Sequence, residues 1–183
     1  VIAVTAVINF VNFTDGLDGL VASCMAISLG AIAIDGATGL WPLVGALAGF
    51  LIWNWAPAKV FMGDVGSTFL GAVFAGMVLQ AGTWPQALAL LLLATPLLAD
   101  ACLCVIRRAA AGQRIFQAHR LHLFQRLHRA GWPHQNVAGL YVGATAVLAV
   151  LQLSIGLGGV LVGAVAVIGL GLWLDQKEAV PFA

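Results

Sequence analysis

Polar side chains that could hold a metal ion or a phosphate are concentrated near the start of this chain, in the stretch NFVNFTDGLDGL. On a helix, Asn9, Asn12 and Asp15 would follow one another along nearly one face. Asp18 would extend this row if the turn stayed helical. The glycine after each aspartate lets the backbone come close to a ligand. We therefore expect a binding site here, because carboxylates beside long apolar runs are costly and usually functional.

A second polar cluster lies in WNWAPAKVFMGDVGSTFLG, where Asp64 follows Gly63 and precedes a Gly-Ser-Thr helix start. Free backbone N–H groups at a helix N-terminus favour a phosphate. A phosphate would repel Asp64, so we expect this carboxylate to act through Mg²⁺, which is commonly held by one or two carboxylates and phosphate oxygens. Phe61 and Trp55 could stack on a base, although from the residues alone an interfacial anchor is the favoured role.

Both acidic clusters also allow a plainer interpretation. Thr14 or Asp15 could cap the helix that follows, and Asp64 could be the N-cap of its own helix. Asp100 lies within an apolar run, where an acid by default partners a residue of a neighbouring helix. The three cysteines also fall in apolar runs without CxxC spacing, so we expect them to be packing residues: Cys24, Cys102 and Cys104.

The only long basic segment is RRAAAGQRIFQAHRLHLFQRLHRAGWPH. If it were helical, four basic residues would form one stripe: His119, His122, Arg126 and Arg129. This segment could lie on anionic lipid headgroups, or it could close over a diphosphate, which Arg forks match well. Its histidines have no Cys or acid beside them in the sequence, which argues against a zinc site.

The rest of the chain is strongly apolar, so we expect it to form membrane-spanning helices that position these clusters. Of its 183 residues, 62% are hydrophobic and 8% are charged, and the mean hydropathy is +1.03. The fold class that we predict is therefore all-α, a polytopic membrane bundle of about seven helices with an extended loop at 107–135. The predicted spans are 1–13, 17–35, 40–56, 66–82, 84–106, 136–155 and 158–175.

Alternation of these spans across the bilayer places all eight Lys and Arg residues on one side. Short basic loops favour the cytoplasm, so we predict a multi-pass membrane protein whose basic side faces the cytoplasm. The three polar clusters share this side, which predicts one site at the cytoplasmic face.

At this point the motifs resemble those of a known family. NFVNFTDGLDGL is similar to NxxNxxDGxDGL, and FMGDVGSTFLG is similar to FMGDxGSxxxG, of the polyprenyl-phosphate N-acetylhexosamine-1-phosphate transferases (glycosyltransferase family 4), which include the lipid I translocase and O-antigen initiating transferases. TPLLAD resembles their PxxD element, and AHRLHLFQRLHRAGW resembles their histidine-bearing loop. The resemblance implies transfer of N-acetylhexosamine-1-phosphate from a UDP-sugar to undecaprenyl phosphate with Mg²⁺ and release of UMP.

The resemblance also implies roles for individual residues. Asp64 would hold the magnesium ion, Phe61 would stack on uracil and Asp18 would contact it. Four residues would line the nucleotide-sugar pocket: Asn12, Asp15, Asn54 and Gly63. Arg120 and His122 would meet the diphosphate. We count Asp15, Asp18, Asp64 and His122 as catalytic, and the others as substrate-binding residues.

This chain departs from the family pattern in two ways. Nothing here matches the family's acidic DDxxK element, and the chain opens inside an apolar segment without Met. We therefore expect the C-terminal part, 1–183, of a longer transmembrane catalytic domain, inactive alone. Where many members have HxHH, this chain keeps only His122. That difference favours initiators of O-antigen or exopolysaccharide, with UDP-GlcNAc or a UDP-6-deoxy-HexNAc as donor.

The competing hypothesis is a transporter, or an inactive membrane subunit, that binds a phosphorylated solute. Transporters tend to place polar residues near the bilayer midplane in repeated halves. In this sequence the polar residues fall at span ends, only Asp100 approaches mid-span, and no repeat is visible. The expected partners are the UDP-sugar, undecaprenyl phosphate and membrane lipid, with no nucleic acid and with a homodimer left open.

Overall fold

The protein is an assembly of helices and loops, in agreement with the predicted all-α class. The computed structural model describes residues 1–114 and 119–182. Within these ranges the helices are α1 (Ile2–Phe13), α2 (Leu20–Ile34), η1 (Thr38–Leu40), α3 (Trp41–Asn54), α4 (Gly63–Leu79), α5 (Trp84–Leu92), α6 (Thr95–Ala110), α7 (Leu123–Arg129), α8 (His134–Ile155) and α9 (Leu157–Lys177).

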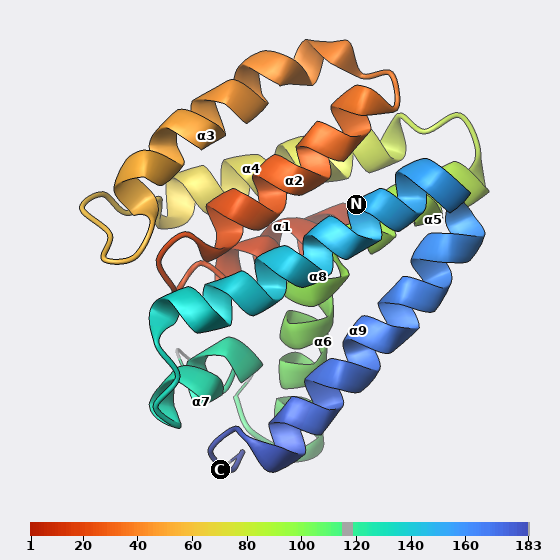
Figure 1. Ribbon diagram of the computed structural model, residues 1–183. Helices are drawn as coiled ribbons and strands as arrows, with labels where there is room; N and C mark the ends of the chain where they lie inside the picture. Colours follow the sequence, from red (N-terminus) through yellow and green to blue (C-terminus); the bar gives the residue numbers. More distant parts are fainter. Residues whose placement is uncertain (115–118, 183) are drawn as a thin grey trace.

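The helices pack both with sequence neighbours and with helices that are distant in the sequence. α1 lies along α4, and α2 lies between α3 and α8, whose other side contacts α9 (Figure 1). Small residues permit the close α1–α4 contact, because a Cβ at Gly71 would come within 2.9 Å of Ile8 Cα. This contact brings the ends of two polar motifs together.

Helix length separates the apolar elements into two groups. α8 and α9 have 22 and 21 residues and are long and apolar enough to cross a membrane, and α5 with α6 would be a third span if the bent pair counts as one. α1, α2, α3 and α4 are shorter apolar helices. Together these elements account for the seven predicted apolar segments. Large apolar side chains of α8 and α9, such as Val147 and Val162, are exposed as lipid-facing residues would be.

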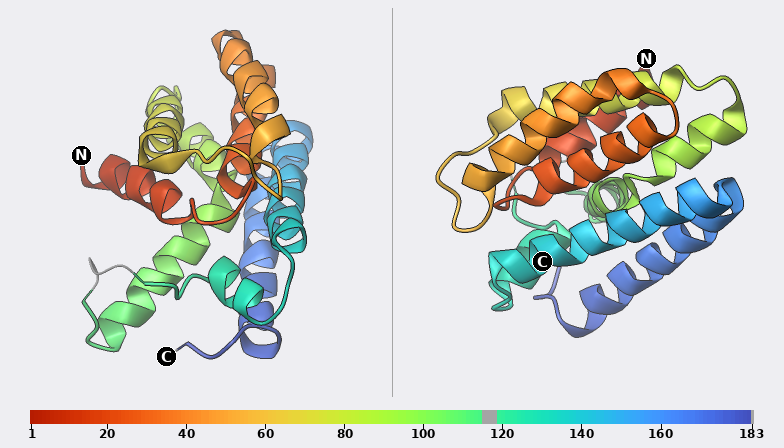
Figure 2. Two further views of the ribbon diagram at one scale, coloured as in Figure 1. Left: turned by 90° about the vertical axis from the view of Figure 1, so that its left-hand side faces the viewer. Right: turned by 45° about the horizontal axis from the view of Figure 1, so that its top comes forward.

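The predicted span 84–106 is wrong as a single helix. It breaks between α5 and α6, whose axes are bent by 83°. Pro96 lies in the first turn of α6. A proline ring inside a continuous helix would clash with the preceding turn, so the helix breaks before it. In the left view of Figure 2, α6 consequently slants away below α1.

The connections that carry polar residues gather at one end of the bundle. They are the α1–α2 turn, the α3–α4 loop, the start of α8 and the segment around α7 (Figure 1). Direct contacts join them, since Gln135 Nε2 donates to the Ala56 carbonyl at 2.8 Å, and a Cβ on Gly16 would lie 3.2 Å from the Phe124 ring. The convergence of three motifs predicted from the sequence is therefore present in the fold.

Residues 115–118 of the predicted loop 107–135 lie outside the described residues, and much of the remainder is helical. α6 continues to Ala110, α7 forms a short helix and α8 begins at His134. The predicted helical stripe does not form, because α7 begins only at Leu123, after His119 and His122.

Candidate functional site

The first two motifs meet at the side chain of Asn12. Its amide, at the end of α1, donates to Asp64 Oδ1 at 3.2 Å and to Ser67 Oγ at 2.9 Å, both in the first turns of α4. Ser67 Oγ in turn donates to the Gly63 carbonyl at 3.1 Å. Asn12 thereby orients the Asp64 carboxylate.

Asp15 and Asp64 lie close enough to influence each other's charge. The pKa of Asp15 is raised to about 6, first by burial and second by the Asp64 carboxylate, and a hydrogen bond with Ser67 opposes both effects. Two neighbouring carboxylates beside an amide form a donor set of oxygens that suits a hard divalent cation such as Mg²⁺. The residues present therefore fit the metal that the motif implies.

Neither acid acts as a simple helix cap. The N-cap of α2 is Gly19, in a left-handed conformation, and the N-cap of α4 is Met62. Asp64 instead lies exposed in the first turn of α4, beyond Gly63, whose φ of +66° is left-handed and suits glycine. The capping interpretation of these residues is wrong, and their carboxylates are left for other partners.

The α4 N-terminus faces outward beside an exposed aromatic ring. Phe61 is 74% exposed and lies two positions before Gly63. The unpaired N–H groups and the dipole of a helix N-terminus attract phosphate oxygens. An exposed ring and an anion-attracting helix end thus stand next to the Asp64 carboxylate.

The predicted helical row does not reach Asp15 or Asp18, because α1 ends at Phe13. The two aspartates lie in the turn between α1 and α2, and Asp18 points away from Asp64. The Asp18 carboxylate turns toward the α3–α4 loop, where Oδ2 accepts from the Ala58 N–H at 3.1 Å. His134 Nδ1, at the start of α8, lies 3.3 Å from the same oxygen. The sequence analysis missed His134, and only its position directly after a Trp-Pro pair at a helix start could have indicated it.

Asn54 is buried and joins the first two motifs through their backbones. Its Oδ1 accepts from the Gly19 N–H at 3.2 Å, and its Nδ2 donates to the Val60 carbonyl at 2.9 Å. Trp55 packs beside it, because a Cβ at Gly19 would lie 2.7 Å from the indole ring. Both ends of the Asn54 amide are therefore engaged within the protein.

Asp100 holds the basic segment against the bundle. Its two carboxylate oxygens accept from the N–H groups of Leu123 at 2.7 Å and Phe124 at 3.3 Å, and from the Tyr141 hydroxyl at 2.7 Å. This confirms the expectation that Asp100 partners a neighbouring helix. The N-terminus of α7 is anchored to α6 and α8 through this one side chain.

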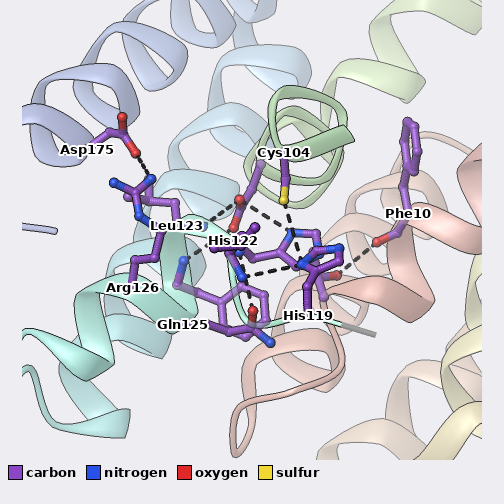
Figure 3. Close-up of polar contacts among 12 residues, drawn as sticks. Phe10, Cys104, His119, His122, Leu123, Gln125, Arg126 and Asp175 are labelled. Carbon is purple, nitrogen blue, oxygen red and sulfur yellow. Dashed lines mark hydrogen bonds and ion pairs between the residues drawn. The ribbon is translucent and has the colours of Figure 1, made fainter. Parts of the chain in front are cut away.

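His122 is packed inside the protein. It is 3% exposed and its ring stacks between those of His119, at a centroid distance of 5.0 Å, and Phe124, at 5.6 Å. Burial lowers the pKa of His119 to about 4, and His122 contributes to this shift. Figure 3 shows both histidines beside Cys104, whose Sγ lies 4.0 Å from His119 Nδ1. Arg120, between them in sequence, is exposed.

Two arginines of the basic region bind the C-terminal segment. Arg107 lies 2.7 Å from Asp175, and Arg126 forms a hydrogen bond with the other oxygen of the same carboxylate (Figure 3). Phe182 lies against both guanidinium groups. Arg126 is 2% exposed, so the expectation that it lies in a cationic lid is wrong.

Comparison with known proteins agrees with the motifs. The glycosyl transferase family 4 model matches residues 1–82, which include Asn12, Asp15 and Asp64. The chain is 36% identical to the phospho-N-acetylmuramoyl-pentapeptide-transferase of Mycobacterium ulcerans, with 75% of this chain and 45% of the relative aligned. It is 35% identical to the transferase of the same name from Bacillus mycoides, with 81% and 48% aligned.

The chain thus spans about half the length of the curated relatives that it matches. A similar relation holds for the transferase of Halalkalibacterium halodurans, at 39% identity over 70% of this chain and 42% of the relative. These matches and the apolar helices identify a bacterial membrane protein. The chain belongs to glycosyl transferase family 4.

Proposed function

We propose that this chain carries the nucleotide-sugar site of an enzyme that transfers N-acetylhexosamine-1-phosphate from a UDP-sugar to undecaprenyl phosphate, with release of UMP. The observation that carries this proposal is the hydrogen bond from Asn12 to Asp64, with Asp15 beside them. It joins two sequence-distant motifs into one oxygen-rich group at a helix N-terminus, which is what a metal-bound diphosphate requires.

Asp64 and Asp15 would hold Mg²⁺ in this proposal. When bound, the ion would neutralise charge on the diphosphate during transfer. Asn12 keeps the Asp64 carboxylate oriented, and the N–H groups near Gly63 approach the phosphate. Phe61 is exposed beside them and offers a face for the uracil ring.

Asp18 supports uracil recognition from the other side of the α3–α4 loop, together with His134. Asn54 would shape the pocket through the backbones of Gly19 and Val60. Arg120 is exposed and would reach the diphosphate. His122 is buried, so we assign to it the positioning of Arg120 and not a direct contact with substrate.

The orientation that we propose places the polar end of the bundle at the cytoplasmic face of the inner membrane. At this end the α3–α4 loop carries Lys59 and α7 carries Arg126, and basic short loops favour the cytoplasm. Nucleotide sugars are made on that side, and the lipid acceptor reaches it from the surrounding bilayer.

Two kinds of donor have support. The loop keeps only His122 of the family's HxHH cluster, which favours UDP-GlcNAc or a UDP-6-deoxy-HexNAc as the donor. The relatives are named phospho-N-acetylmuramoyl-pentapeptide-transferases, which favours a phospho-N-acetylmuramoyl-pentapeptide as the transferred group instead. Its donor in this proposal would be the UDP derivative. Both kinds of donor carry the same UDP and diphosphate, so the site described above serves either of them.

The test measures UMP release in membranes from cells that express the gene encoding this chain. UDP-GlcNAc, UDP-6-deoxy-HexNAc and UDP-N-acetylmuramoyl-pentapeptide are supplied in turn, with and without undecaprenyl phosphate and Mg²⁺. Release that requires both lipid and metal supports the proposal, and the preferred donor identifies the sugar. Absence of UMP with every donor, combined with uptake of a labelled phosphorylated solute into vesicles, would favour the transporter instead.

A further inference from the structure

Cys104, His119 and His122 bring potential metal-ligand atoms together, and of the three the proposed reaction uses only His122, which positions Arg120. One ligand atom from each residue lies within 4.8 Å of the other two. Cys104 comes from α6, whereas the two histidines precede α7 (Figure 3). Cys104 and His122 are each 3% exposed and His119 is partly buried, so the cluster is shielded from solvent. The sequence could not show this, since 15 positions separate Cys104 from His119.

The donor set selects a particular class of cation. A thiolate with two imidazoles suits Zn²⁺ and related transition metals, whereas Mg²⁺ prefers oxygen ligands. Zn–S and Zn–N bonds of about 2.3 and 2.1 Å place tetrahedral ligands roughly 3.5 Å apart. Small rotations of the three side chains would bring their atoms to that spacing.

Asp100 lies where it could accept a hydrogen bond from a metal-bound histidine. His122 Nδ1 lies 3.6 Å from Asp100 Oδ1. Metal-binding histidines usually donate their second ring N–H to a carboxylate, which fixes the ring and its tautomer. The Asp100 carboxylate is itself held by Leu123 and Tyr141, so its position is rigid.

His122 also has a buried ring nitrogen without a hydrogen-bond partner. This nitrogen is Nδ1, and buried polar atoms are normally satisfied. A metal on the other ring nitrogen would leave the proton on Nδ1, directed toward Asp100. His119 Nδ1 contacts the Leu121 N–H at a long 3.3 Å, so this ring can also turn toward a metal.

We propose that Cys104, His119 and His122 bind Zn²⁺, which pins the segment before α7 to α6. A water molecule would complete the tetrahedron. Arg120 lies between the two histidine ligands in sequence, so the metal would hold this exposed residue in place at the polar end of the bundle. The site differs from the oxygen-rich Mg²⁺ site in its residues and in its preferred metal.

The test uses the protein purified in detergent, stripped with chelator and titrated with Zn²⁺ or Co²⁺. Metal content by mass spectrometry and the absorption spectrum of the Co²⁺ form are measured for wild type, Cys104→Ser and His119→Gln. Cys102→Ser, on the same helix but outside the cluster, is the matched control. Because His119 is partly exposed, His119→Gln keeps the test valid if Cys104→Ser misfolds.

Wild type and Cys102→Ser should each bind a single equivalent of Zn²⁺, with a thiolate-to-Co²⁺ charge-transfer band and a higher melting temperature after Zn²⁺ addition. Cys104→Ser should lose the band, and His119→Gln should bind Zn²⁺ at least 10-fold more weakly. The proposal is overturned if wild type binds no Zn²⁺, or if neither variant weakens binding. UMP release with Mg²⁺ is measured separately, so failure of the zinc site leaves the proposed reaction standing.

Discussion

Asn12 and Asp64 are 52 positions apart in the sequence, yet the Asn12 amide donates a 3.2 Å hydrogen bond to the Asp64 carboxylate. The bond exists because α1 lies along α4, with Gly71 against the backbone of Ile8. The two acidic motifs of this chain therefore form one polar group. Substitutions that disturb this group should change metal use, stability or both.

Asn12→Ala should weaken the use of Mg²⁺ because the Asp64 carboxylate loses the group that orients it. Loss of such a supporting hydrogen bond typically weakens metal binding by about 10- to 100-fold. The apparent Mg²⁺ affinity in the UMP-release assay measures the effect. Asn9→Ala is the control, since the Asn9 amide binds the Thr5 carbonyl of its own helix. Equal effects of the two substitutions would contradict the role given to Asn12.

Asp15→Asn should stabilise the metal-free protein while lowering its activity. The pKa of Asp15 is raised to about 6 from 3.8, so near neutral pH the fold carries a carboxylate that it disfavours. A tenfold change in proton affinity corresponds to about 1.4 kcal/mol, and with solvent screening we expect a gain in the free energy of unfolding of about 1 to 2 kcal/mol.

This gain should depend on pH in one direction. The carboxylate becomes protonated in the folded protein below its pKa of about 6, so the advantage of Asp15→Asn should shrink as the pH falls toward 3.8. Melting temperatures in EDTA across this range provide the measurement, with Asp35→Asn at the opposite end of the bundle as control. A gain that grows as the pH falls would refute the assigned cause.

Gly71→Ala should push α1 away from α4. The added Cβ would lie 2.9 Å from Ile8 Cα, and such overpacking costs about 1 to 3 kcal/mol. Gly76→Ala, in the same helix, meets nothing within 4 Å and should be neutral or slightly stabilising. Thermal unfolding in detergent compares the two variants. UMP release should fall only with Gly71→Ala, because only there are Asn12 and Asp64 separated.

Asn54→Ala should destabilise the polar end of the bundle. The Gly19 N–H and the Val60 carbonyl would both lose their partner, at a cost of about 2 kcal/mol. Asn136→Ala, at an exposed position in the first turn of α8, is the control and should change little. If the two variants unfold at the same temperature, Asn54 does not join these loops.

The sequence alone predicted the features that depend on local pattern. Apolar length predicted the helices, and motif similarity predicted that Asp15 and Asp64 would meet. The break before α6 is caused locally by Pro96. The sequence analysis did not predict it, because the apolar run is long enough for a single span. The Asn54 contacts with Gly19 and Val60 depend on how loops meet, which no spacing reveals.

The structure of the basic segment also depends on contacts that local sequence pattern does not reveal. A helical pattern through His119, His122 and Arg126 predicted a charged stripe, but Asp100 fixes the start of α7 at Leu123 through long-range hydrogen bonds. Asp175, 49 positions from Arg126, then draws that arginine inward. Tertiary partners therefore decided which basic residues remain exposed.

The central claim is that Asp64 is the metal-holding residue of a UDP-sugar site. The most direct test compares UMP release by wild type, Asp64→Asn and Asp35→Asn in membranes supplied with UDP-sugar, undecaprenyl phosphate and Mg²⁺. Asp35 lies exposed at the far end of α2, where Gln152 donates to it at 3.2 Å. We predict that Asp64→Asn abolishes UMP release, while Asp35→Asn retains it. Unchanged release in Asp64→Asn would contradict the claim.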